Sequence, residues 1–529
     1  KERAFEGCTS LVNASFPLAT GLGYKAFESC TSMTRLCMRS VTYDNINQYG
    51  YGSASIASVW MPKLTLSQFQ QRVNTWETGD HTSQAACGDD PSTSPTTSET
   101  TTTTETTATA TTSATTTTVP ICYIDDANYT TVLADSSCTN VQFVGNTALP
   151  VLKDNCTHME VFEAPDFTGN IPDLMLYDCD ALVEVSFPVM TGNIGNQAFR
   201  DCGELKTASF PVMAGNIGEF AFANSRKLES AYFPEMTGDI GGWAFQYCDD
   251  LESAYFPVMD GVMNENAFDD CLKLSSVSFP NMTGDIPTLA FQNCQSLTNV
   301  SFPAMNGSIG NRAFEECDKL HSVSFPEMTG NIGTKAFHNC PLLYSVSFPE
   351  MTGNIGKEGF KSCTNLVEAS FPSMAGEIGR YAFQDCTNLV TAYFPVMERD
   401  ILDSAFERCE KLETADFPEM TGISKGLDVR VFKDCKSLTS ASFPKMTTKI
   451  MDQVFLGCEN LVSANFSSMT GNIDKEAFMN CTKLETVHFP AMIGEIGNGA
   501  FRRSGLLEAN FPSLKGLIGR NAFTDCTNL

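Results

Sequence analysis

Cysteine is the residue whose spacing most suggests chemistry in this chain of 529 residues. From Cys156 to Cys409 the cysteines fall at multiples of 23 residues, and the interval resumes after one slip of three residues. Such regularity could serve disulfides or a metal, but the CxxC and paired Cys/His spacings of metal sites are absent from the sequence. Ser225 and Ser504 replace two cysteines without a compensating partner, and the uninterrupted run that starts at Cys248 has eleven members, an odd number. We therefore expect mostly buried free thiols, with disulfides between adjacent repeats as the alternative.

Four cysteines lie outside this interval, near places where a repeat array would begin or end. Cys122 with Cys138, and Cys37 with Cys87, are the disulfides that we predict there, because chain ends that lack neighbours gain most from a covalent link. Free thiols in a reducing compartment are the alternative.

Catalytic patterns are missing from the sequence. Its five histidines, at positions 81, 158, 321, 338 and 488, share no motif, and GxSxG, HExxH, Walker A and GxGxxG patterns are absent. Turn residues such as Asp239, Asn331 and Asn354 could each offer an oxygen to Ca²⁺, but no known calcium-loop pattern surrounds them. We predict a non-enzymatic protein without cofactor or metal.

The residues between consecutive cysteines define a structural unit, which we call a rung. One rung contains Leu297-x-x-Val300-x-Phe302-Pro303, a Gly-containing turn, Ile309-Gly310, and Ala313-Phe314-x-x-Cys317. Its first part alternates like a short strand with one buried face, and Ala-Phe-x-x-Cys suits one short helical turn behind that strand. A unit of this kind buries its core only by stacking on neighbours. The sequence therefore predicts an α/β repeat solenoid of leucine-rich repeats, with about sixteen rungs and a length of roughly 75 Å at ~4.8 Å per strand.

The pattern of Ala-Phe-x-x-Cys-x-x-Leu followed by a short strand and Pro resembles the BspA-type leucine-rich repeat of surface-exposed bacterial and protist proteins. The resemblance covers residues 1–36 and about 159–529. It implies a solenoid, an extracellular or cell-surface location and an adhesive or interaction role, and it offers no catalytic residue. This chain departs from the pattern in its uniform Phe-Pro-x-Met-Thr-Gly core and its Thr-rich linker.

Five segments are expected along the chain. Residues 1–36 end a first solenoid, 37–87 form its C-terminal cap with an amphipathic helix over 67–76, 88–120 form a mucin-like linker, 121–158 form an N-terminal cap, and 159–529 form a second solenoid without a cap at its end. The linker consists almost wholly of Thr, Ser, Ala and Pro, which is typical of an O-glycosylated stalk, with an unmodified flexible linker as the alternative. Its O-glycosylation candidates are Thr100, Thr101, Thr102, Thr103, Thr104, Thr115, Thr116, Thr117 and Thr118.

N-glycosylation acceptor sequences Asn-x-Ser/Thr recur along the chain. Asn155 and Asn480 directly precede a cysteine of the 23-residue series, so we expect them to be the least accessible. The remaining candidates are Asn13, Asn128, Asn281, Asn299, Asn306 and Asn465.

Charge excludes two classes of partner. With 62 acidic and 34 basic residues the formal net charge is -28, which disfavours nucleic acid and anionic membrane surfaces.

The longest apolar runs fall short of the 18 or so residues that a membrane-spanning helix needs. The chain also opens inside a repeat, which indicates a mature or partial chain.

Two functions of different class follow. The strand residue before Phe-Pro is mostly Ser, interrupted by Tyr232, Tyr255 and Tyr393, so the inner face is flat and nearly uncharged. Uniform rungs favour a structural unit of an extracellular filament, and the last eleven residues match the first eleven in register, which suggests head-to-tail self-association. The alternative is an adhesin whose inner face binds host, matrix or partner-cell ligands around the tyrosines.

Overall fold

The structure, a computed structural model, describes residues 121–125, 127–146, 148–422 and 424–529, together with three short strands before them. The chain divides into two compact units, Lys1–Thr112 and Ser113–Leu529. The first unit contains β1 (Asn13–Ser15), β2 (Arg35–Cys37) and β3 (Ser58–Trp60), which pair in parallel in chain order. The helix expected over 67–76, the side chains of Cys37 and Cys87, and the Thr stalk lie outside the described residues.

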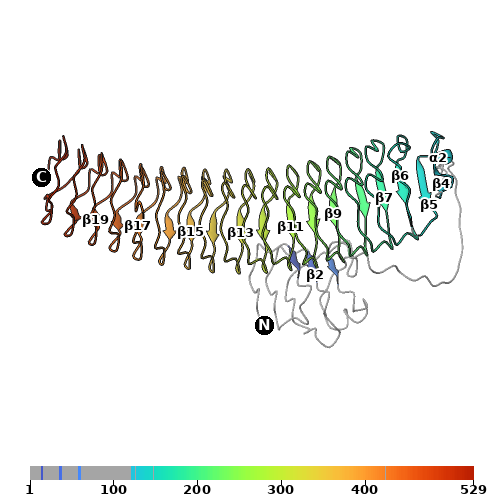
Figure 1. Ribbon diagram of the computed structural model, residues 1–529, viewed down its shortest axis with the longest axis horizontal. Helices are drawn as coiled ribbons and strands as arrows, with labels where there is room; N and C mark the ends of the chain where they lie inside the picture. The colour runs from blue at the N-terminus through green and yellow to red at the C-terminus, as the bar shows by residue number, and fades with distance from the viewer. Residues whose placement is uncertain are drawn as a thin grey trace, which may run out of the picture. The chain divides into compact units, whose positions relative to one another are not determined.

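The second unit is a single row of stacked rungs, which Figure 1 shows running from β4 to the C-terminus. It begins with β4 (Ile121–Ile124), the four-residue helix α2 (Tyr129–Val132) and β5 (Asn140–Phe143). The three-residue strands that follow are β6 (Val161–Glu163), β7 (Glu184–Ser186), β8 (Thr207–Ser209), β9 (Ser230–Tyr232), β10 (Ser253–Tyr255), β11 (Ser276–Ser278), β12 (Asn299–Ser301), β13 (Ser322–Ser324), β14 (Ser345–Ser347), β15 (Glu368–Ser370), β16 (Thr391–Tyr393), β17 (Thr414–Asp416), β18 (Ser440–Ser442), β19 (Ser463–Asn465) and β20 (Thr486–His488).

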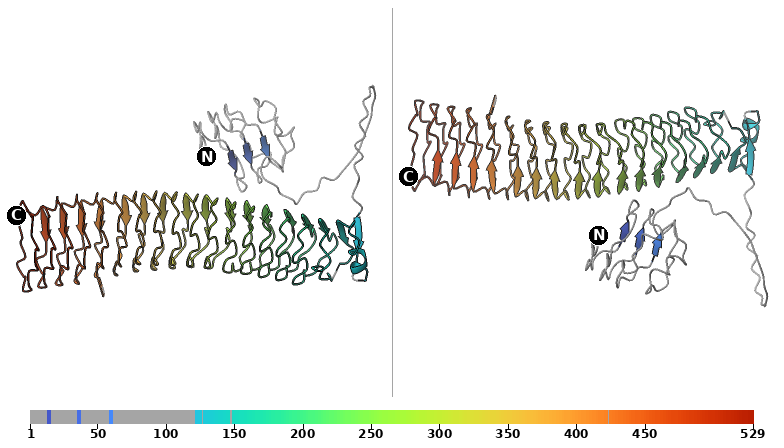
Figure 2. Two further views of the ribbon diagram at one scale, coloured as in Figure 1. Left: turned by 90° about the horizontal axis from the view of Figure 1, so that it is seen from above. Right: turned by 90° about the horizontal axis from the view of Figure 1, so that it is seen from below.

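These strands form three parallel sheets that line one side of the row, as Figure 2 shows. The sheets are β4 to β8, β9 to β16 and β17 to β20, and within each sheet neighbouring strands come from successive rungs. Residues at equivalent positions of successive rungs face each other in this register, for example Val300 and Val323. The register follows from the constant rung length, and the middle residue of β12, Val300, is buried while its neighbours Asn299 and Ser301 are exposed.

The segment expected to be a helical turn is not helical. Its N–H groups alternate: those of Arg312, Phe314 and Glu316 donate to carbonyl groups of the following rung at 2.8, 2.8 and 2.9 Å. Arg312 and Glu316 also have positive φ angles of 55° and 62°, which interrupt any right-handed helix. The segment is therefore a chain of tight turns held by the neighbouring rung. About half of the N–H groups in this segment donate to the neighbouring rung. The Ala-Phe-x-x-Cys spacing therefore serves the stacking of rungs rather than a helix.

Phenylalanine fills the core in two columns. Phe314 stacks on Phe337 with ring centroids 5.2 Å apart and an interplanar angle of 7°. Phe302 stacks on Phe325 at 5.8 Å and 7° in the second column. Each such pair adds about 0.5–1.5 kcal/mol beyond area burial. Repeated along the unit, these contacts make each rung depend on both neighbours and hold the surface residues at fixed intervals.

Candidate binding surfaces

The buried thiols share one hydrogen bond, to a backbone carbonyl group of the preceding rung. This bond limits which residues can occupy their position. Cys202, Cys526 and the cysteines from Cys248 to Cys481 are free, and all but Cys526 are fully buried. Cys340 shows the contact, because its Sγ donates to the carbonyl oxygen of Phe314 in the preceding rung at 3.1 Å. The position therefore needs a small side chain with a donor.

Serine meets the same requirement. The Oγ of Ser225 donates to the carbonyl oxygen of Phe199 at 2.8 Å. Burial raises the pKa of the Cys202 thiol to about 12 and raises the pKa of Cys271 in the same way. Since the thiolate is the reactive form, these cysteines are structural rather than nucleophilic.

Two cysteines of the 23-residue series depart from the free-thiol expectation. Cys156 and Cys179 are joined in a disulfide across adjacent rungs, with Cα atoms 5.3 Å apart, a distance that disulfides favour. The expectation of a free thiol is therefore wrong at these two positions. Cys122 and Cys138, in the cap itself, also form a disulfide, with a Cα–Cα distance of 5.7 Å.

The turns that contain Ala-Phe-x-x-Cys carry buried carboxylates, of which Glu315 bonds to side chains of both neighbouring rungs. Glu315 accepts from Nε2 of Gln292 in the preceding rung and from Nζ of Lys335 in the next, both at 3.0 Å. His338 lies 3.2 Å from the same carboxylate, and burial together with Lys335 lowers its pKa. Within the described part of the chain, His, Cys, Asp and Glu do not gather into any group that could hold a metal ion.

The strand face brings two of the three predicted tyrosines together. Tyr232 on β9 and Tyr255 on β10 stack with centroids 5.3 Å apart and an interplanar angle of 7°. Tyr393 is 51% exposed but lies on β16, at the other edge of the same eight-stranded sheet. The pair forms one local aromatic feature, and Tyr393 forms another.

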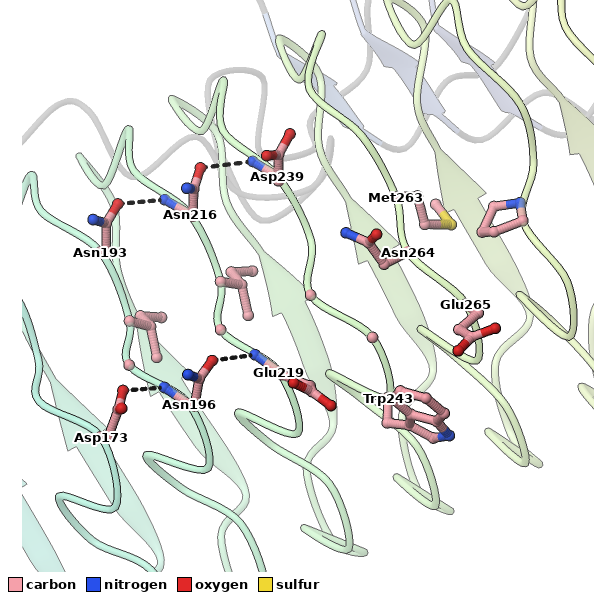
Figure 3. A pocket seen from close by; sticks show the side chains of 17 residues that line it. Asp173, Asn193, Asn196, Asn216, Glu219, Asp239, Trp243, Met263, Asn264 and Glu265 are labelled. Carbon is pink, nitrogen blue, oxygen red and sulfur yellow. Dashed lines mark hydrogen bonds between the residues drawn. The ribbon is translucent and has the colours of Figure 1, made fainter.

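A second surface lies beside the turns that follow Met-Thr-Gly, where a shallow groove of about 740 Å³ opens (Figure 3). Two rows of polar side chains border it. In the upper row of Figure 3, Oδ1 of Asn193 accepts from the N–H of Asn216, and Oδ1 of Asn216 accepts from the N–H of Asp239, both at 2.8 Å. The lower row lies three residues further along each rung. There Oδ1 of Asp173 and Oδ1 of Asn196 accept from the N–H groups of Asn196 and Glu219 at 2.7 and 2.8 Å. We call this surface the asparagine groove, and its principal residues are Asp173, Asn193, Asn196, Asn216, Glu219, Asp239, Gly242, Trp243, Met263, Asn264, Glu265 and Pro287.

Local departures from the repeat create the hollow. Gly242 occupies the position of Asn196 and Glu219, so one side chain is missing from the lower row. Within the described rungs, bridges between isoleucine positions join Ile171 through Met263 and Ile286 through Ile518, but none joins Met263 to Ile286. Pro287 explains this gap, because it lacks the N–H that Gly310 donates to the preceding rung.

Sequence reasoning named Asp239 only as a possible calcium ligand, and the structure places it in the upper row with its Oδ1 accepting from the N–H of Val262 at 2.7 Å. Asn331 and Asn354 lie on the same row, outside the groove. In the sequence, Asn or Asp recurs at this position every 23 residues, and this recurrence indicates a ladder of hydrogen bonds between rungs. The groove itself depends on the rungs in which the recurring pattern is interrupted.

The N-glycosylation candidates differ in exposure. Asn281, Asn299 and Asn306 are exposed. Asn128 and Asn465 are half-buried; Oδ1 of Asn128 accepts from the N–H of Asp125 at 2.8 Å.

The sequence as a whole places the chain in a family. The model of the BspA type leucine rich repeat region matches residues 1–73, 169–298, 284–413 and 399–529. The chain therefore belongs to the BspA-type leucine-rich-repeat family. Leucine-rich-repeat proteins are typically non-enzymatic scaffolds for protein–protein interaction, with extended binding surfaces built from their stacked repeats. None of the curated proteins matches the sequence.

Several solved structures are similar. A leucine-rich repeat protein from Bacteroides ovatus is 23% identical, with 70% of this chain and 85% of that chain covered and a TM-score of 0.45. A leucine rich cell surface protein from Faecalibacterium prausnitzii is 21% identical over 66% and 89% of the two chains, with a TM-score of 0.28. A leucine rich repeat protein from T. pallidum is 23% identical over 35% and 78%, with a TM-score of 0.27. In the described part of this chain, every helix is too short or too polar to cross a membrane.

Proposed function

We propose that this chain is a non-enzymatic extracellular or cell-surface scaffold whose second unit acts as a stiff structural element of a filament. The observation that carries the proposal is the near-uniform stacking of the rungs. The same phenylalanine contact recurs from Phe199 on Phe222 to Phe501 on Phe523, with interplanar angles of 14° and 3° at the two ends. A core contact repeated in this way suits length and stiffness.

Contacts along the axis of the row would extend such a unit. Leu517 is 75% exposed, and an apolar group of this size favours association when another surface covers it. A head-to-tail contact does not close on itself and therefore builds filaments rather than rings.

Electron microscopy and sedimentation of the native protein over a range of concentrations test the proposal. We expect rods that lengthen with concentration, and Leu517→Lys should shorten them. Well-separated monomers at the highest concentration would contradict the filament.

An adhesin is the second candidate, and the stacked Tyr232 and Tyr255 favour it as an aromatic anchor on the strand face. Tyr255→Ala should then weaken adhesion to cells or matrix, while the matched variant Tyr393→Ala, on a strand without a tyrosine neighbour, should not. Equal behaviour of both variants would remove the support for this anchor.

Glycans complete the proposal. We place O-glycans on the Thr linker and N-glycans on the exposed Asn281, Asn299 and Asn306. Mass spectrometry before and after enzymatic release of N-glycans from the native protein tests these positions, and unmodified peptides would contradict them.

A further inference from the structure

We infer that the asparagine groove binds a carbohydrate chain, which its amide donors and carboxylate acceptors hold by the hydroxyl groups of the sugar. This site is separate from the strand face and from the ends of the row. Three features carry the inference: free amide donors in a row, carboxylates without a basic partner, and an aromatic side chain in a gap of the lower row.

The amide nitrogens provide the donors. Asn193, Asn196 and Asn216 each use Oδ1 to accept a backbone N–H of the next rung. Their side chains are exposed, and within the described residues none of the three Nδ2 groups donates a hydrogen bond. Figure 3 shows these amides on successive rungs along both borders of the groove. The backbone contact fixes each side chain, so a ligand would find ordered donors at intervals of about 4.8 Å.

Carboxylates provide the acceptors. Asp173, Glu219, Asp239 and Glu265 are exposed, and the described lining residues include no Lys, Arg or His. An anionic ligand would be repelled by this border. A hydroxyl group both donates and accepts, so a sugar with several hydroxyls can satisfy the carboxylates and the amides together. A basic peptide would also pair with the carboxylates, and its backbone carbonyl groups are acceptors for the amides, so the test below includes one.

Trp243 adds an apolar surface beneath the gap at Gly242. Its ring stacks on Phe220 with centroids 5.0 Å apart and an interplanar angle of 11°. In the described structure its indole N–H donates no hydrogen bond, so it remains available to a ligand. From the rung of Asp173 to that of Glu265 there are four rung intervals, or roughly 20 Å at ~4.8 Å each. The groove therefore suits an extended oligosaccharide rather than one sugar.

The repeat itself supplies a test that spares the fold. Asp173 occupies the position of Asn196 and makes the same backbone contact, and Asp239 does so at the position of Asn216. Asn196→Asp with Asn216→Asp should thus keep the ladder while removing two donors. Asn311→Asp with Asn331→Asp is the matched control, because Oδ1 of each control residue makes the same contact outside the groove at 2.8 Å.

Calorimetry of the full chain with cellohexaose, chitohexaose and mannohexaose, and with hexalysine as a basic peptide, measures the binding. We expect at least one of these oligosaccharides to bind, the groove variant to weaken that binding about tenfold or more, and the control variant to match the unaltered protein. For hexalysine the added carboxylates would instead tighten binding. The inference is overturned if none of the three oligosaccharides binds, if both variants lose affinity equally, or if hexalysine alone binds.

Discussion

Ser225 offers a direct measurement of what the cysteine position requires. Its Oγ donates to the carbonyl oxygen of Phe199 at 2.8 Å, and both groups are fully buried. Ser225→Ala would leave that carbonyl without a donor, at a cost of about 1–3 kcal/mol. Ser225→Cys should restore the contact, since Cys248 makes it to the carbonyl of Phe222 at 3.2 Å in the next rung. We therefore expect the alanine variant to be destabilised and the cysteine variant to remain close to the original protein.

Hydrogen exchange read by mass spectrometry locates this effect. Each rung contacts only its neighbours, so the loss should be confined to the rungs around Ser225. A cost of about 1–3 kcal/mol corresponds to a roughly 5- to 150-fold faster exchange of their backbone amides. The rungs near Phe478 serve as an internal reference. The reasoning is refuted if Ser225→Ala exchanges like the original protein, or if Ser225→Cys exchanges as fast as Ser225→Ala.

Further expectations concern the thiols, the phenylalanine columns and one buried carboxylate. Alkylating reagents should leave Cys248 to Cys481 unmodified in the native protein and should modify them after denaturation without reductant, as mass spectrometry would show; a need for reductant would contradict the free thiols. Phe314→Ala should cost about 3–5 kcal/mol in a denaturant titration, because it empties one layer of a column. For Asp400, burial alone would raise the pKa, but hydrogen bonds from Ser424 and the two following backbone N–H groups outweigh it and hold the pKa below its usual value. Its stabilising effect on the 424–426 loop should thus be complete above about pH 4 and fade as pH falls further. Asp400→Asn should loosen that loop at pH 7, and unchanged hydrogen exchange there would contradict this.

The sequence alone determined the rung and its core. Because each position recurs every 23 residues, the inward-facing residues such as Val300, Phe302 and Phe314 could be recognised from one rung and checked against the others. The stacking of equivalent positions also followed, because the same residue pattern recurs from rung to rung. Ser225, in a cysteine position, already indicated that a small side chain suffices there.

Tertiary structure decided the features that depend on contacts between rungs. Phe314 donates its N–H to the next rung rather than to its own, so the spacing of Ala-Phe-x-x-Cys could not distinguish a helical turn from a stacked turn. Cys156 and Cys179 form a disulfide because the stack brings their Cα atoms to 5.3 Å from each other. The asparagine groove exists because Gly242 and Pro287, which lie two rungs apart, interrupt two ladders. Each of these outcomes depends on partners about 23 residues away, and only the folded stack brings those partners within a hydrogen bond's length.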